Sequence, residues 1–290
     1  MKQTTYDDPI QLSPIAIPSD FNSAVDIIIP YHGEYQKLTT LLDSIFRLIR
    51  SNYYKVCIVD DASPNASFIE IIKQNAAKNA AKRKGENVVQ TIRLKEQCGF
   101  AGALKAGFEA TSNPYVCFIN SDCKIEDVNW LRGMGECLMA TKHLGVRMVA
   151  PMTDNAVGGH PAQQCSKEDR FNRPYNPVSA EGSDFSVINS DHIILKKDDY
   201  LSMYCFMCER GLFQECGGFI KEYPYGYYED EEFAARMQHR GFKQAVSQNS
   251  WVHHDGQLTI KRIWRENPKV KDIMEVENRE RCIADMKKLI

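Results

Sequence analysis

Short apolar runs alternate with segments of helical periodicity through the first half of this chain. The runs are too short for buried helices, and each is typical of a strand that is buried on both faces. These predicted strands are residues 25–29, 56–59, 87–94, 115–120 and 145–150. The predicted helices between them are residues 38–49, 67–84, 99–108 and 126–142. The alternation predicts an α/β fold, with a mostly parallel central sheet and helices on both faces.

Polar residues follow three of these strands directly. Pro30 and Tyr31 end the first, Asp60 and Asp61 the second, and the 120–122 segment, Asn-Ser-Asp, the fourth. Right-handed crossovers bring such strand ends to one edge of the sheet, where α/β proteins bind their ligands. A carboxylate there can hold a hard divalent cation against a phosphate.

Composition sets limits on partners and setting. The formal net charge is -2, which gives no global support to nucleic acid or an anionic membrane as partner. The 10 cysteines include no C-x-x-C pair, and several sit in apolar runs. With no signal-peptide pattern and no window of membrane-spanning length, we expect a cytoplasmic protein without an integral membrane segment.

The chain divides into three parts by composition. Residues 1–23 are polar and predict an irregular lead-in, and residues 24–257 form the main domain. Inside this domain the pattern changes at residue 151, and residues 152–190 predict long loops that could shape a substrate pocket. Residues 258–290 are charged and predict a helical tail.

Each candidate motif has a structural interpretation beside a functional one. Asp122 could bind a metal or cap the following helix. Asp60 and Asp61 could accept a hydrogen bond from a nucleobase or form a turn. Glu229 and Asp230 could supply a general base or simply begin a solvated helix.

The same holds for two late segments. His253 and His254 could complete a metal site, protonate a leaving group, or be structural. The tyrosine-rich loop at residues 223–228 could stack on a sugar or pack in the ordinary way.

The order of these elements resembles glycosyltransferase family 2, which has the GT-A fold. The matching elements share the family's order and spacing over about residues 24–260. They are Val-Asp-Ile-Ile-Ile-Pro-Tyr at 25–31, Val-Asp-Asp-Ala-Ser at 59–63, Gly-Phe-Ala-Gly-Ala-Leu-Lys-Ala-Gly-Phe at 99–108, Asn-Ser-Asp at 120–122, Gly-Gly-Phe at 217–219, Tyr-Glu-Asp-Glu-Glu-Phe-Ala-Ala-Arg at 228–236 and Val-His-His at 252–254. Cys98, Lys105, Ile220 and Glu232 depart from the usual residues, which blurs the identity of the donor.

The resemblance implies an inverting transfer of sugar from a nucleoside-diphosphate sugar, UDP- or dTDP-linked, to a hydroxyl acceptor. Residues 24–150 would be the nucleotide-binding half and residues 151–257 the acceptor and catalytic half. Asp230, with Glu229 beside it, would be the general base. Mn²⁺ or Mg²⁺ would be bound by Asp122 with His253, and His254 would be the near alternative. The implied donor-binding residues are Pro30, Tyr31, Glu34, Asp60, Asp61, Gly99, Lys105, Asn120, Ser121 and Asp122.

Other functions stay open from sequence alone. A sugar-phosphate nucleotidyltransferase or a non-catalytic nucleotide-sugar-binding module would suit a similar sheet. The acceptor could be a glycan, a protein or another hydroxyl compound. Nucleic acid is disfavoured by the overall charge, although Lys261, Arg262 and Arg265 could form a local basic face. The tail could also mediate a homodimer.

Overall fold

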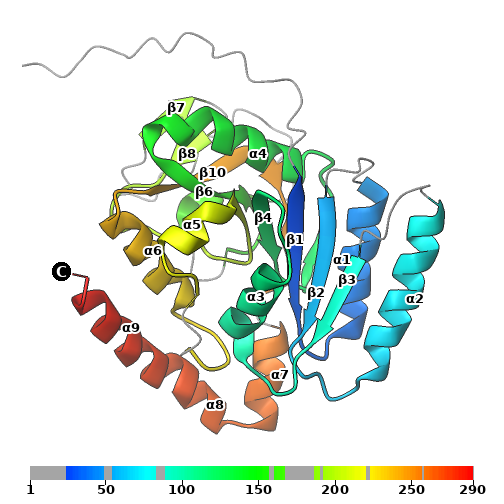
Figure 1. Ribbon diagram of the computed structural model, residues 1–290. Coiled ribbons are helices and arrows are strands. Elements are labelled where there is room, and N and C mark those ends of the chain that lie inside the picture. The colour runs from blue at the N-terminus through cyan, green and yellow to red at the C-terminus, as the bar shows by residue number, and fades with distance from the viewer. Residues whose placement is uncertain are drawn as a thin grey trace, which may run out of the picture.

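Among the described residues, nine strands form one central sheet in the order β3-β2-β1-β4-β9-β6-β10-β8-β7 (Figure 1). The computed structural model describes residues 24–48, 54–82, 89–156, 160–166, 186–189, 192–219, 223–256 and 258–289. The strands of this sheet are β1 Val25–Tyr31, β2 Tyr54–Asp60, β3 Val89–Arg93, β4 Tyr115–Ile119, β6 Val146–Met152, β7 Ser186–Asn189, β8 His192–Ile194, β9 Cys205–Glu209 and β10 Lys243–Trp251. The predicted lead-in at residues 1–23 and much of the predicted loop region, at residues 167–185, lie outside the described residues.

The first four strands are parallel. β1 lies between β2 and β4, with Val25 opposite Tyr54 on one side and Tyr115 on the other. The sheet then becomes mixed, because β9 runs antiparallel between β4 and β6. A second, two-stranded sheet joins β5 Cys123–Lys124 to β11 His253–His254.

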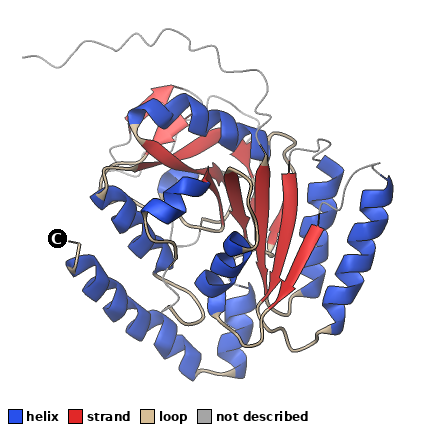
Figure 2. Ribbon diagram, in the orientation of Figure 1, coloured by secondary structure: helices blue, strands red, loops and turns tan. Residues whose placement is uncertain are grey.

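Helices cover both faces of the central sheet, as Figure 2 shows. One face packs on α1 Tyr35–Leu48, α2 Ser67–Lys82 and α4 Trp130–Thr141. The other packs on α3 Gly99–Glu109, α5 Arg210–Glu215 and α6 Glu229–His239. Side chains alternate along β1, so Ile27 and Ile29 face the first layer and Ile28 the second. Burial on both faces explains why these strands are continuous apolar runs.

α4 begins at Trp130, later than the predicted residue 126. Asp127 accepts a hydrogen bond from the Asn129 amide and holds a local turn there.

The remaining elements are short or lie at the C-terminal end. Two 3₁₀ turns are Lys142–Leu144 and Pro161–Gln163. The tail is helical: α7 Leu258–Glu266, α8 Lys269–Asp272, a π-helical turn Ile273–Glu277 and α9 Asn278–Lys287.

A buried ion pair ties β1 to the end of β9. Asp26 is 2% exposed, and its carboxylate accepts from Arg210 Nη2 at 2.8 Å. It also accepts from the backbone and side-chain amides of Asn113 at 2.7 and 2.8 Å. This cluster lies at the amino end of β1, so it stabilises the fold away from the carboxyl ends of the strands.

Candidate functional site

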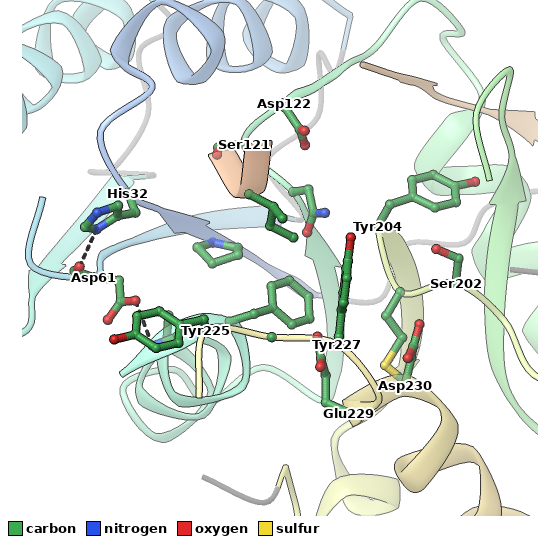
Figure 3. A pocket seen from close by; sticks show the side chains of 18 of the residues that line it. His32, Asp61, Ser121, Asp122, Ser202, Tyr204, Tyr225, Tyr227, Glu229 and Asp230 are labelled. Carbon is green, nitrogen blue, oxygen red and sulfur yellow. Dashed lines mark hydrogen bonds between the residues drawn. The ribbon is translucent and has the colours of Figure 1, made fainter. Parts of the chain in front are cut away.

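A cavity of about 570 Å³ opens where β1, β2 and β4 end (Figure 3). Ten of the residues that the sequence predicted for the site line it. They are Pro30, Tyr31, Asp61, Gly99, Asn120, Ser121, Asp122, Glu229, Asp230 and His254. In Figure 3, Ser121 and Asp122 lie at the top of the view and Glu229 and Asp230 at the bottom, with Tyr227 between them. The structure therefore gathers residues from both halves of the chain around one space.

Asp122 and His254 meet because the two-stranded sheet brings them together. In it, His254 lies opposite Cys123, and the Asp255 amide donates to the Asp122 carbonyl at 3.1 Å. His254 Nε2 is then 3.4 Å from Asp122 Oδ1. The imidazole also stacks on Tyr204, with ring centroids 4.9 Å apart, so its orientation is fixed.

The chemistry of this pair fits a divalent cation. His254 Nδ1 is 2.9 Å from the Asn155 carbonyl, which only accepts hydrogen bonds, so Nδ1 carries the proton of the neutral ring. Its Nε2 is buried, and no described residue forms a hydrogen bond with it. A nitrogen lone pair and a carboxylate oxygen thus face each other, and either a cation or a proton between them removes the repulsion. Burial by itself lowers the pKa of His254, but the Asp122 carboxylate and the Asn155 carbonyl outweigh it and raise that pKa.

Cys123 lies close enough to share the site but is poorly suited to it. Its sulfur is within ligand-to-ligand distance of Asp122 and His254. Burial raises the pKa of the Cys123 thiol well above its usual value, and the Asp122 charge raises it further. Hard cations such as Mn²⁺ and Mg²⁺ prefer carboxylate oxygen and imidazole nitrogen to thiol sulfur. Asp122 and His254 are therefore the two side chains of this group that would suit such a cation.

His253 does not line the cavity. Its Nδ1 is 2.5 Å from Asp154 Oδ2, and its Nε2 is 3.4 Å from Asp255 Oδ1. Neighbouring residues of a strand point to opposite faces, so His253 and His254 cannot both reach Asp122. The sequence favoured His253 as the partner of Asp122, but the structure brings the alternative, His254, to Asp122.

The two aspartates after β2 have different surroundings. Asp60 is fully buried, accepts from the Ser63 amide at 2.9 Å and pairs with Arg93, so it is directed into the turn and away from the cavity. Asp61 lines the cavity, and its two oxygens accept from the Cys98 and Gly99 amides at 2.6 and 2.8 Å. Burial raises the pKa of Asp61 despite these hydrogen bonds. Of the two aspartates, Asp61 is therefore the one placed to contact a bound ligand.

Two further predicted residues lie outside the cavity. Glu34 forms an ion pair with Arg262 of α7 at 2.8 Å. Lys105 is about half exposed on α3, 3.9 Å from Glu109. Glu34 and Lys105 therefore lie near the surface and do not contact the cavity.

Glu229 and Asp230 begin α6 as adjacent carboxyl groups, of which Glu229 is buried and Asp230 is half-buried. Burial raises the pKa of Glu229 to about 8, and the charge of Asp230 adds to the effect. Burial raises the pKa of Asp230 to about 6. Glu229 Oε2 is buried and has no hydrogen-bond partner among the residues described. At neutral pH the pair therefore holds one proton, mainly on Glu229, and one ionised carboxylate, mainly on Asp230.

The loop before α6 has an unusual backbone. Tyr225, Tyr227 and Tyr228 have φ of 67°, 74° and 71°, and Gly226 has φ of 124°. Non-glycine residues in this region cost about 1–2 kcal/mol each, so the loop needs support from its neighbours. One such neighbour is Gly99, whose backbone packs closely against Tyr225. A Cβ at position 99 would lie 2.7 Å from the Tyr225 nitrogen, so this close contact requires glycine. All four loop residues line the cavity.

Other lining residues were not predicted from the sequence. Some lie in loops and some in the tail. They are His32, Gln97, Phe100, Ala103, Tyr200, Ser202, Met203, Tyr204, Ile260, Ile263 and Glu275. Only Phe100 and Ala103 belong to a motif of the family, and the others carry no local signal because distant packing brings them to the cavity.

Comparison with known proteins identifies the family. The family described as Glycosyl transferase family 2 matches residues 26–216, more than half of the chain. The chain belongs to this family. The predicted family and the predicted transferase class are thereby confirmed. No match was found among curated proteins.

Solved structures with similar folds are glycosyltransferases of low sequence identity. GalNAc-T7, in a structure with UDP, GalNAc and Mn²⁺, has a TM-score of 0.58 at 15% identity, over 80% of this chain and 44% of its own. The mannosyltransferase PcManGT of Pyrobaculum calidifontis, with GDP-Man and Mn²⁺, has a TM-score of 0.54 at 15% identity, over 84% and 61%. S. aureus TarS 1-349 has a TM-score of 0.51 at 12% identity, over 92% and 71%.

These similarities confirm the predicted GT-A fold. This family 2 chain spans less than two thirds of the first two neighbours, at 44% and 61% of their lengths. Within the described ranges, none of its helices combines the length and apolar character needed to cross a bilayer.

Proposed function

We propose that this chain transfers a sugar from a nucleoside-diphosphate sugar to an acceptor hydroxyl, with inversion at the anomeric carbon. The observation that carries the proposal is the pairing of Asp122 with His254 in the same cavity as Glu229 and Asp230. Glycosyltransferases of similar fold contain UDP or GDP-Man with Mn²⁺ in their structures, which supports a nucleotide-sugar donor here.

The chain's own residues suit the two ends of such a donor. Asp61, at the end of β2, would accept a hydrogen bond from the ring N–H of a uracil or thymine base, in keeping with a UDP- or dTDP-linked sugar. Asp122 and His254 would hold Mn²⁺ or Mg²⁺. When bound, the cation would neutralise charge on the diphosphate leaving group.

Asp230 is the proposed general base. It is largely ionised at neutral pH, because its pKa is raised only to about 6, whereas Glu229 beside it, with a pKa of about 8, keeps a proton. The acceptor oxygen forms a bond to the anomeric carbon as the bond from that carbon to the diphosphate oxygen breaks. The hydroxyl proton moves to the Asp230 carboxylate. A single displacement of this kind inverts the anomeric centre.

In this proposal residues 24–150 bind the nucleotide and residues 151–257 bind the acceptor and carry the base. Support comes from the cavity, which takes Asp61 and Asp122 from the first range and Asp230 and His254 from the second.

The test is a panel of nucleotide sugars incubated with Mn²⁺ and simple hydroxyl acceptors. Release of nucleoside diphosphate and a product of opposite anomeric configuration, read by NMR, are expected. Release of pyrophosphate would favour a nucleotidyltransferase. A binding module would be favoured if the protein binds a donor but neither transfers its sugar nor slowly hydrolyses it.

A further inference from the structure

We propose that Asn278 is a positioning residue that holds the aromatic loop, residues 223–228, and with it the start of α6. Asn278 is the first residue of α9, and it does not itself line the cavity. The inference rests on the proposed function at one point only, the assignment of Asp230 as the base.

The aromatic loop is strained where it leads into the site. Its three non-glycine residues of positive φ are Tyr225, Tyr227 and Tyr228, and Tyr228 is the residue immediately before α6. Glu229 and Asp230 follow directly. Because L residues leave this backbone region when they are free to do so, contacts from elsewhere must hold the loop in place.

Asn278 supplies such contacts to the loop backbone. The side chain is fully buried, and its Nδ2 donates to the Gly226 carbonyl at 2.8 Å and the Pro224 carbonyl at 3.0 Å. Both amide hydrogens are thereby used on carbonyls that flank Tyr225. The residue follows the π-helical turn Ile273–Glu277, a local irregularity that often occurs at functional positions.

Neighbouring tail residues contact the same loop. The Trp264 and Tyr227 rings meet edge to face, with centroids 6.0 Å apart. The Met274 methyl is 3.9 Å from the position that a Cβ on Gly226 would take. Asn278 thus lies within a packed contact between the tail and the aromatic loop.

The tail is also anchored to the opposite side of the cavity. Arg262 donates to Glu34 Oε1 at 2.8 Å and to the His32 carbonyl at 3.0 Å, just after β1. Figure 1 shows α7 below α3, and α9 running beside α6. Residues 258–289, here called the C-terminal strap, therefore contact both the end of β1 and the loop before the base. This arrangement lets Asn278 set the position of Asp230 relative to the donor side.

The experiment compares Asn278→Ala and the isosteric Asn278→Asp with Val270→Ala. Val270 is buried in the same strap but carries no hydrogen-bonding group, so it controls for loss of packing alone. The three readouts are the transfer rate, calorimetric binding of UDP with Mn²⁺, and chymotrypsin cleavage after Tyr225, Tyr227 and Tyr228.

We expect wild-type protein and Val270→Ala to resist cleavage in the loop, and both Asn278 variants to be cut at least about tenfold faster. Misplacement of a catalytic group by about 1 Å can cost 100-fold, so kcat should fall by about that factor in the Asn278 variants. Binding of UDP with Mn²⁺ should weaken much less than kcat falls, because Asp122 and His254 do not contact Asn278 or the aromatic loop backbone that it binds.

Three results would overturn the proposal. The first is rapid cleavage of the loop in wild-type protein, which needs no variant to be folded. The second is an equal loss of kcat in Val270→Ala at matched thermal stability. The third is a wild-type rate in both Asn278 variants. If wild-type protein transfers no sugar at all, the proposed function fails, while the protease comparison still decides whether Asn278 holds the loop.

Discussion

The burial of Glu229 predicts an unusual pH dependence of stability. The side chain is 8% exposed, and burial with the nearby Asp230 charge raises the pKa from 4.5 to about 8. The folded protein thus keeps a proton that the unfolded chain releases. The free energy of unfolding must therefore fall as pH rises from about 4.5, and the fall ends near pH 8. At about 1.4 kcal/mol per pH unit, it amounts to roughly 4 kcal/mol between pH 5 and pH 8.5.

Glu229→Gln removes this dependence, because Gln has the shape of the protonated acid and does not titrate. Urea denaturation of both proteins at pH 5, 6.5 and 8.5, followed by tryptophan fluorescence without added divalent cation, measures it. The variant should gain roughly 4 kcal/mol on wild type between the two extremes. Glu280→Gln, an exposed site on α9, is the matched control and should follow wild type. If the stability difference between Glu229→Gln and wild type is the same at pH 5 and pH 8.5, the folded protein does not hold a proton on Glu229.

Three other predictions concern the site and the fold. Asp230→Asn should lower the transfer rate by about 10²–10⁴-fold with near-normal donor binding, and the wild-type rate should rise with pH through about 6. Equal steady-state transfer rates for Asp230→Asn and wild type would exclude this base. Asp122→Ala and His254→Ala should each weaken calorimetric binding of UDP with Mn²⁺ by at least about 100-fold, whereas the adjacent control His253→Ala should bind within a few-fold of wild type; a loss only in the control would reverse the assignment. Asp26→Ala should destabilise the fold by about 3–5 kcal/mol in denaturant titrations, because it leaves a largely buried guanidinium without its carboxylate; a change below about 1 kcal/mol would contradict this.

The sequence predicted the fold well because its signals are local. The runs that became β1, β2 and β4 are apolar and short, and each ends in polar residues, so strand type and the position of Asp61 and Asp122 at strand ends follow directly. The beginning of α4 was placed too early because a side-chain hydrogen bond from Asp127 competes with the helix.

The rest of the site depends on pairing between distant segments. His253 and His254 are indistinguishable until the register of β11 on β5 is known. Asp60 and Asp61 can likewise be told apart only by their binding partners. Asp60 pairs with Arg93, and Asp61 accepts hydrogen bonds from the start of α3.

The contribution of the tail was missed for the same reason. Ile260 and Ile263 reach the cavity because Arg262 binds beside the end of β1, more than 200 residues earlier in the chain. No local pattern in a charged helix predicts such a contact. A homodimer formed through this tail stays a prediction.

Anomalous scattering from a crystal grown with UDP and Mn²⁺ tests the proposed metal site most directly. One manganese peak is expected at coordination distance, roughly 2 Å, from both an Asp122 oxygen and His254 Nε2, with the diphosphate completing its shell. Manganese bound at His253, or UDP bound outside this cavity, would contradict it.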